Sequence, residues 1–119
     1  MDNVRYKLDK DANLWWSKDG KDWAESKDNR IKSIMMMIVI LEQLPFEEWL
    51  SYLESMKELG MITDLKEAVL NEIACNHVDD SWRFNAIDLL IDNQMLTEDI
   101  RAIILEKETD EEILQLLND

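Results

Sequence analysis

The sequence contains little of what disulfide-stabilised or catalytic proteins need. Its 119 residues include one cysteine, one histidine, one proline and two glycines. A single cysteine, Cys75, cannot form an intramolecular disulfide, so nothing calls for an oxidising compartment and we expect a cytoplasmic protein. Scarce glycine and proline favour helices over a turn-rich β fold. With 46% hydrophobic and 34% charged residues, the composition is that of a folded globular protein.

Long apolar runs are also missing. The longest covers the eight residues 34–41 (IMMMIVIL), whereas a membrane-spanning helix needs about 20 residues. The N-terminal residues MDNVRYKLDKD lack the apolar segment of a secretory signal. We therefore expect a soluble protein with no membrane contact, in which residues 34–41 lie in the core.

Negative charge dominates, and it is unevenly distributed. The net charge is −14; residues 1–33 contain eight basic and seven acidic side chains, whereas residues 34–119 contain five basic and twenty acidic ones. Affinity for phosphate depends on Lys and Arg, so direct binding to nucleic acid or to an anionic membrane is disfavoured. The acidic region is instead suited to a larger protein that carries a basic groove.

Residues 1–28 differ from the rest of the chain. Apolar and basic residues alternate in VRYKL, and an Asp-Gly pair lies between two tryptophan-bearing segments. Glycine accepts the positive φ of a tight turn, so we predict a hairpin of two or three short strands within residues 4–25. Residues 17–23 (SKDGKDW) also resemble the turn of an Asp-box, Ser-x-Asp-x-Gly-x-x-Trp, shortened by one residue. One such copy implies no glycosidase activity.

Residues 29–119 have helical periodicity. Apolar stripes at i, i+3, i+4 and i+7 predict about six short helices, and short turns require neighbours to pack antiparallel. We expect Gly60 to end the second helix and Thr97 to begin a later one. Capping-box patterns mark two further starts, one at residues 64–67 (Asp to Glu) and one at residues 109–112 (Thr to Glu). The predicted fold is mainly α, of the α+β class, with residues 1–119 forming a single domain.

Part of the helical region resembles a known repeat. Residues 79–90 (DDSWRFNAIDLL) place an acidic turn before an arginine and an Ala-x-x-Leu stripe, and on this basis residues 62–117 resemble HEAT-type helical hairpins. No clean internal period accompanies the resemblance. The region can therefore form either a compact irregular bundle or a fragment of a solenoid. The resemblance implies the surface of a structural adaptor or regulatory subunit.

Residues that could carry catalysis are scarce. His77 lies in CNHVDD (residues 75–80), but no partner ligand has the spacing of a metal site, and a histidine near the C-terminal dipole of a helix is the simpler interpretation. No serine lies in a nucleophile-elbow context, and the two glycines are too far apart for a phosphate-binding loop. We therefore expect no enzymatic activity and no metal, nucleotide or other cofactor.

Two sets of residues are candidates for binding a partner protein. Trp15 and Trp16 are adjacent, so in a strand they point to opposite faces and cannot both enter one core; with Trp23 they make the hairpin a candidate interface. The second set consists of carboxylate pairs at predicted helix starts, which are candidate docking charges or simply solvated helix ends. These pairs are Asp79 and Asp80, Glu98 and Asp99, and Glu111 and Glu112.

Small size, high acidity and the lack of recognisable chemistry predict a non-enzymatic protein-binding module. Its general character resembles that of small phage anti-defence proteins and bacterial immunity proteins, which implies an inhibitor that blocks a larger partner by contact. The alternatives are a HEAT-like adaptor or regulatory subunit, and an inhibitor whose carboxylates mimic nucleic-acid phosphates. A homodimer formed through exposed tryptophans is a further alternative.

Overall fold

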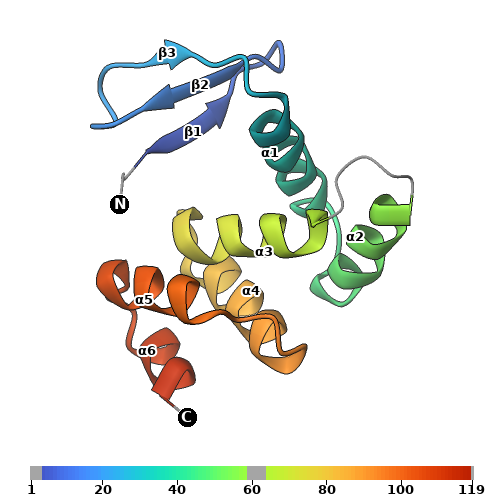
Figure 1. Cartoon of the computed structure of the whole chain (residues 1–119), viewed down its shortest axis with the longest axis vertical. Helices are drawn as coiled ribbons and strands as arrows, with labels where there is room; N and C mark the ends of the chain where they lie inside the picture. The colour runs from blue at the N-terminus through green and yellow to red at the C-terminus, as the bar shows by residue number, and fades with distance from the viewer. Residues whose placement is uncertain (1–3, 59–63, 119) are drawn as a thin grey trace. The chain divides into compact units, whose positions relative to one another are not determined.

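The computed structural model describes residues 4–58 and 64–118, which contain three strands, six α-helices and one 3-10 helix (Figure 1). Contacts divide the chain into two compact units, Met1–Pro45 and Phe46–Asp119. The first unit contains β1 (Arg5–Leu8), β2 (Leu14–Ser17), β3 (Ala24–Glu25) and α1 (Asn29–Leu41). The second contains η1 (Phe46–Glu48), α2 (Trp49–Glu58), α3 (Leu65–Asn76), α4 (Asp80–Asp92), α5 (Glu98–Lys107) and α6 (Glu111–Asn118). The predicted mainly helical α+β fold is confirmed.

The boundary between the units follows Pro45, whereas the sequence changes from a strand pattern to helical periodicity at residue 29. Helix α1 belongs with the sheet because it contacts β1. Residues 1–45 contain eight basic and eight acidic side chains, whereas residues 46–119 contain five basic and nineteen acidic ones. The first unit is therefore neutral and the second carries the whole net charge. A single domain over residues 1–119 stays a prediction.

The sheet has the strand order β1-β2-β3, and neighbouring strands are antiparallel. The register pairs Lys7 with Trp15 and Tyr6 with Trp16. Paired residues share a face of an antiparallel sheet, so the two adjacent tryptophans lie on opposite faces. Leu14, which is 1% exposed, shares the face of Trp16. The other face carries Lys7 and Trp15.

Asp9 holds the turn between β1 and β2. Its carboxylate accepts hydrogen bonds from the backbone N–H groups of Asp11 and Asn13 and from the indole N–H of Trp15, each at 2.9 Å. These bonds stabilise the charged form, and chiefly the bond from Trp15 lowers the pKa of Asp9 to about 2. The turn therefore depends on an ionised side chain, and it places Ala12 at a φ of 63°.

Asp19 holds the turn between β2 and β3, in the segment that resembles an Asp-box. Its Oδ1 accepts from the backbone N–H groups of Asp22 and Lys21, at 2.9 and 2.8 Å, and from the hydroxyl of Ser17 at 3.0 Å. The bond from Asp22 contributes most to lowering the pKa of Asp19. Gly20 has a φ of 78°, which a side chain would disfavour. The predicted Asp-Gly turn is thus the turn of this hairpin.

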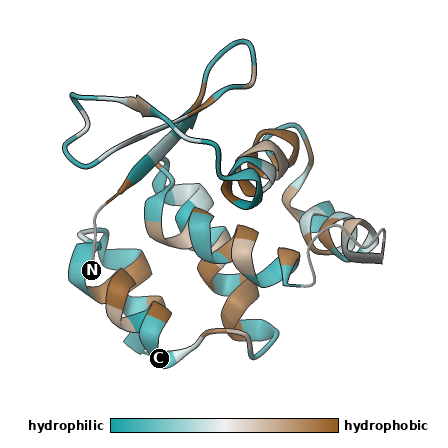
Figure 2. Cartoon of the chain, turned by 45° about the horizontal axis from the view of Figure 1, so that its top comes forward, coloured by the Kyte–Doolittle hydropathy of each residue, from teal (hydrophilic) through white to brown (hydrophobic). Residues whose placement is uncertain are grey.

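In the second unit, α3 contacts α2, α4 and α5, and α4 also contacts α6. Apolar and polar residues lie on the same helices in Figure 2, as expected for amphipathic helices around a core. None of the helices in the described part of the chain is long and apolar enough to span a membrane. The buried apolar side chains of this unit are Trp49, Leu53, Leu65, Val69, Leu70, Ile73, Ala74, Ala86, Ile87, Leu90, Ile104, Ile113 and Leu117.

The predicted helix starts are partly correct. Thr97 caps α5, because its hydroxyl accepts from Ile100 N–H at 3.2 Å. Helix α3 begins at Leu65 with Asp64 as its N-cap residue, as predicted, but the expected side-chain cap is wrong: Asp64 has a φ of −106° and a ψ of 28°, and its side chain makes no cap hydrogen bond. At α6 the prediction is wrong by one residue, because Asp110 rather than Thr109 accepts from the third amide of the helix. The expected helix end at Gly60 lies outside the described residues.

Candidate functional site

A groove of about 320 Å³ lies between α4 and α6 in the second unit, and we call it the acidic groove. The first turns of both helices contribute to it, so carboxylates that favour helix N-termini also line the groove. Its lining residues are Asp80, Ser81, Phe84 and Asn85 from α4, and Asp110 and Glu112 from the start of α6. Asp80 and Glu112, two candidates from the sequence that are thirty-two positions apart, therefore line the same groove.

The three carboxylates of the acidic groove are not equivalent. Asp110 is half-buried, and its Oδ1 accepts from the backbone N–H of Ile113 at 3.1 Å, so it is a helix cap. Asp80 and Glu112 are exposed, and no hydrogen bond to either carboxylate is found among the described residues, although Asp80 interacts electrostatically with Arg83. The groove thus presents two open negative charges at the ends of two helices.

Phe84 is the one aromatic residue among those that line the acidic groove, whose lining is otherwise polar. It is half-buried, and it lies one helical turn after Asp80 on α4. An aromatic ring beside carboxylates suits the side chains of Arg and Lys, whose methylene stems pack on apolar surface while their charged ends remain polar. The lining therefore favours a cationic side chain over an anion or a neutral small molecule.

Helix α4 continues this acidic character beyond the groove. Ser81, Asn85, Asp88 and Asp92 are spaced i, i+4, i+7 and i+11, which places them along one side of the helix. Burial raises the pKa of Asp88, and the charge of Asp92 raises it further. Neither carboxylate has a partner among the described residues. A basic segment lying along α4 would relieve this repulsion.

A buried ion pair fixes the α6 end of the groove. Arg83 Nε and Nη2 donate to the two oxygens of Glu108 at 2.9 and 3.1 Å, and Arg83 Nη1 donates to the carbonyl of His77 at 2.9 Å. Glu108 Oε2 also accepts from the N–H groups of Thr109 and Asp110, both at 3.1 Å. Burial alone would raise the pKa of Glu108, but these hydrogen bonds outweigh it and the pKa is lowered. The pair ties the α3–α4 turn to the start of α6.

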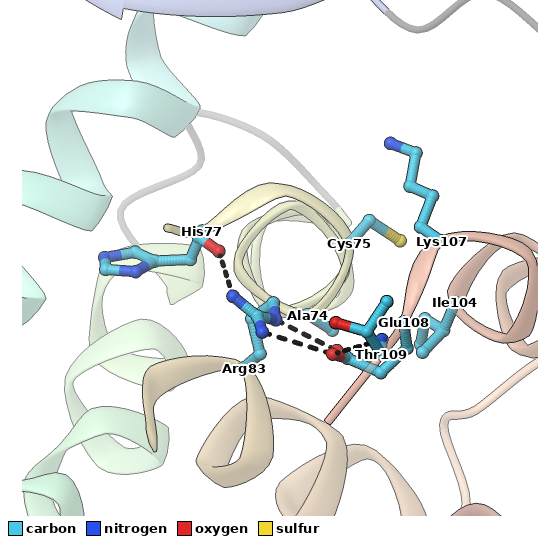
Figure 3. A pocket seen from close by; sticks show the side chains of 8 residues that line it. All are labelled: Ala74, Cys75, His77, Arg83, Ile104, Lys107, Glu108 and Thr109. Atoms are coloured by element: carbon cyan, nitrogen blue, oxygen red, sulfur yellow. Dashed lines mark hydrogen bonds and ion pairs between the residues drawn. The ribbon is translucent and has the colours of Figure 1, made fainter. Parts of the chain in front are cut away.

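A second cavity of about 220 Å³ surrounds this ion pair (Figure 3). The imidazole of His77 points away from Cys75 and stacks on Trp82, with ring centroids 5.0 Å apart. Burial raises the pKa of the Cys75 thiol to about 11, so it is not a thiolate at neutral pH. The lining brings no nucleophile and base together. It consists of Ala74, Cys75, His77, Arg83, Ile104, Lys107, Glu108 and Thr109.

The remaining acidic candidates lie outside the acidic groove. Asp79 is the N-cap of α4, and its Oδ1 accepts from Ser81 N–H at 2.8 Å, which gives it a structural role. Glu98 and Asp99 are exposed in the first turn of α5, and Glu111 is exposed in the first turn of α6. Across residues 4–58 and 64–118, no three His, Cys, Asp or Glu side chains are arranged to hold a metal ion.

The tryptophan candidates divide between the two faces of the sheet in the first unit. Lys7 lies over the ring of Trp23, 4.1 Å from its centroid, and the register places Trp15 on the same face as Lys7. Trp16 lies on the opposite face, and all three tryptophans are half-buried. Trp15 and Trp23 therefore form one surface with Lys7, which we call the aromatic face, and Trp16 does not belong to it.

Sequence reasoning missed Phe84, Asn85 and Asp110. Phe84 could have been found, because it lies at i+4 from Asp80 and shares its side of a helix. No periodicity links α4 to α6, so the acidic groove itself has no signal in the sequence. No protein-family model, curated protein or solved structure matches this chain. The resemblance of residues 62–117 to HEAT-type hairpins stays a prediction.

Proposed function

We propose that this chain is a non-enzymatic protein-binding module whose acidic groove takes up a basic segment of a larger partner protein. The observation that carries the proposal is the pair of open carboxylates, Asp80 and Glu112, beside the half-buried ring of Phe84. Cationic side chains satisfy both parts of this surface at once, because Arg and Lys combine an apolar stem with a charged end. The net charge of −14 would accelerate the encounter with such a partner.

Inhibition of that partner is the consequence we propose. A protein that uses a basic segment to hold a nucleic acid or an acidic substrate loses that function when the segment is occupied. An aromatic residue lines the groove together with the carboxylates, so ordinary blocking of a protein surface suits the groove better than mimicry of a phosphate backbone. A HEAT-like adaptor role would require a second partner bound at the same time.

Neutralisation of two pairs of acidic residues tests the role of the groove. The probe is a fluorescein-labelled hexa-arginine peptide, titrated by anisotropy at about 150 mM salt. We expect Asp80→Asn with Glu112→Gln to weaken binding at least about tenfold, which corresponds to about 1.4 kcal/mol. The matched control, Asp99→Asn with Glu98→Gln, removes the same charge from the first turn of α5 and should change affinity less than about twofold.

Two results would separate the groove from general attraction between an acidic protein and a basic peptide. Equal weakening by both pairs of substitutions would overturn the proposal, because the position of the charge would then not matter. Phe84→Ala should also weaken binding, by about threefold to tenfold, whereas Phe84→Leu should retain part of the affinity because it keeps the apolar surface.

The aromatic face is a second candidate contact surface. Lys7 holds Trp23 and Asp9 holds Trp15, so both rings are fixed before a partner arrives. Preorganised tryptophans are typical of interaction hot spots. Once a partner is known, Trp23→Ala and the groove variants distinguish the two surfaces: contact through the groove weakens steeply with salt, whereas contact through the aromatic face changes little.

A further inference from the structure

The acidic groove combines oxygen acceptors with an aromatic residue, and none of its lining residues is basic. The side chain of Asp110 already accepts a hydrogen bond, because it caps α6. No hydrogen bond to the other four polar side chains of the lining is found among the described residues; these are Asp80, Ser81, Asn85 and Glu112. The four acceptors come from two helices. One ligand that has several donors can therefore bind to both helices at once.

Arg83 does not use these acceptors, although it lies on the same helix as Asp80. Its charged form is stabilised chiefly by the hydrogen bonds to Glu108, and also by the charges of Glu108, Asp80 and Asp110. Its guanidinium donates to Glu108 and to two carbonyl groups of the α3–α4 turn, and Arg83 does not line the acidic groove. A cation from a partner can therefore reach the groove without breaking a hydrogen bond of Arg83.

A guanidinium group matches this lining better than an ammonium group does. Guanidinium is planar, so its N–H groups donate within the plane while its face packs on an aromatic ring. One arginine side chain can thus donate to carboxylates and contact Phe84 at the same time. The ammonium group of lysine is a compact and strongly hydrated point charge without a flat face. Placing it in the groove costs more hydration and uses less of the aromatic surface.

We propose that the acidic groove selects arginine over lysine in the basic segment of its partner, and that Phe84 sets this preference. The inference rests on the function proposed above, because it concerns the same groove. The guanidinium of one arginine donates to the carboxylates at the starts of α4 and α6 while its face packs on Phe84. The carboxylates attract either cation and set the affinity. The aromatic ring sets the choice between the two cations.

The preference is measured with fluorescein-labelled hexa-arginine and hexa-lysine, titrated by anisotropy at about 150 mM salt. The two peptides carry equal charge, so the general attraction to a protein with a net charge of −14 cancels in the ratio of the two dissociation constants. We expect the wild-type protein to bind hexa-arginine at least about fivefold more tightly than hexa-lysine.

Two substitutions of Phe84 test the origin of the preference. Phe84→Leu keeps an apolar side chain but removes the ring, and it should lower the ratio to about two or less by weakening the binding of hexa-arginine. Phe84→Tyr is the matched control, because it keeps the ring and should keep the wild-type ratio. Circular dichroism checks that each variant is folded, and Phe84→Met replaces Phe84→Leu if the latter unfolds.

Failure of this inference is distinguishable from failure of the proposed function. Asp80→Asn with Glu112→Gln should weaken the binding of both peptides, because both are cationic, whereas Glu98→Gln with Asp99→Asn should not. If that pattern holds but the wild-type protein binds both peptides equally, or the variant without the ring keeps the full preference, the groove binds basic segments and the selection of arginine is wrong. If both pairs of substitutions weaken binding equally, the proposed function is wrong and this inference falls with it.

Discussion

Acidic residues serve different purposes in the two units. In the first unit, Asp9 and Asp19 accept hydrogen bonds from backbone and side-chain donors within tight turns, and both pKa values are lowered. In the second unit, Asp80 and Glu112 line a groove, and no hydrogen bond to either carboxylate is found among the described residues. Residue type is similar in both units, but the second unit brings two carboxylates without hydrogen-bond donors to one groove. The comparison shows that acidity suggests binding only where the fold leaves carboxylates unsatisfied.

The largest expected effect concerns Glu108, the acidic residue of the second unit whose carboxylate is paired with Arg83 and accepts further hydrogen bonds. Arg83→Ala leaves the Glu108 side chain, which is 4% exposed, without its ionic partner. We expect a loss of about 2–3 kcal/mol in the free energy of unfolding, measured in urea. Lys66→Ala breaks the exposed pair with Glu54, whose N–O distance is 3.5 Å, and should cost less than about 0.5 kcal/mol.

A double-mutant cycle with Glu108→Ala sharpens this test. If Arg83 and Glu108 stabilise the unit through their contact, the cost of the double substitution will be well below the sum of the single costs. Additive costs would mean that the pair does not fix the end of the groove. Glu108 would then not differ in its contribution to stability from the carboxylates that line the groove without hydrogen-bond donors.

The pH dependence of Asp9 tests the first unit. Folding lowers its pKa from 3.8 to about 2, so its ionised form stabilises the folded state. That contribution is complete above the unfolded pKa and is lost as pH falls from about 4 toward 2. We expect Trp15 fluorescence to report a transition in this range, and Asp9→Asn to abolish it and lower the thermal midpoint at pH 7.

The same substitution in the second unit provides the contrast. Asp80→Asn removes no hydrogen bond within the described protein, so its effect on stability at pH 7 should stay within about 0.5 kcal/mol. Equal shifts of the thermal midpoint in Asp9→Asn and Asp80→Asn would break the comparison between the units.

Two small stabilising effects are expected in both units alike. Ala12 in the first unit has a φ of 63°, and Gln94 after α4 in the second has a φ of 59°. Left-handed backbone is costly for residues with a Cβ, so Ala12→Gly and Gln94→Gly should each raise the free energy of unfolding by about 0.5–1 kcal/mol. Thermal unfolding measures both. A destabilised Gln94→Gly variant would show that its side chain has an important contact.

Short-range features were well predicted because short-range physics causes them. The Asp-Gly turn, the alternation that separates Trp15 from Trp16, and the cap at Thr97 depend on residues within a few positions of each other. The errors were also local. At α6, Thr109 and Asp110 can each cap a helix, and Glu108 accepts from the N–H groups of both, so the helix begins one residue later than predicted.

The sequence by itself determined the fold class, the placement of negative charge after residue 33, and the division of the adjacent tryptophans between two faces. Periodicity and turn chemistry suffice for these properties because each depends on neighbouring residues. The tertiary structure decided that Asp80 and Glu112 share one groove while Glu98 and Asp99 do not, and that α1 belongs with the sheet. These outcomes depend on which helices pack together across twenty-five or more residues, as Arg83 and Glu108 do, and no local pattern encodes that choice.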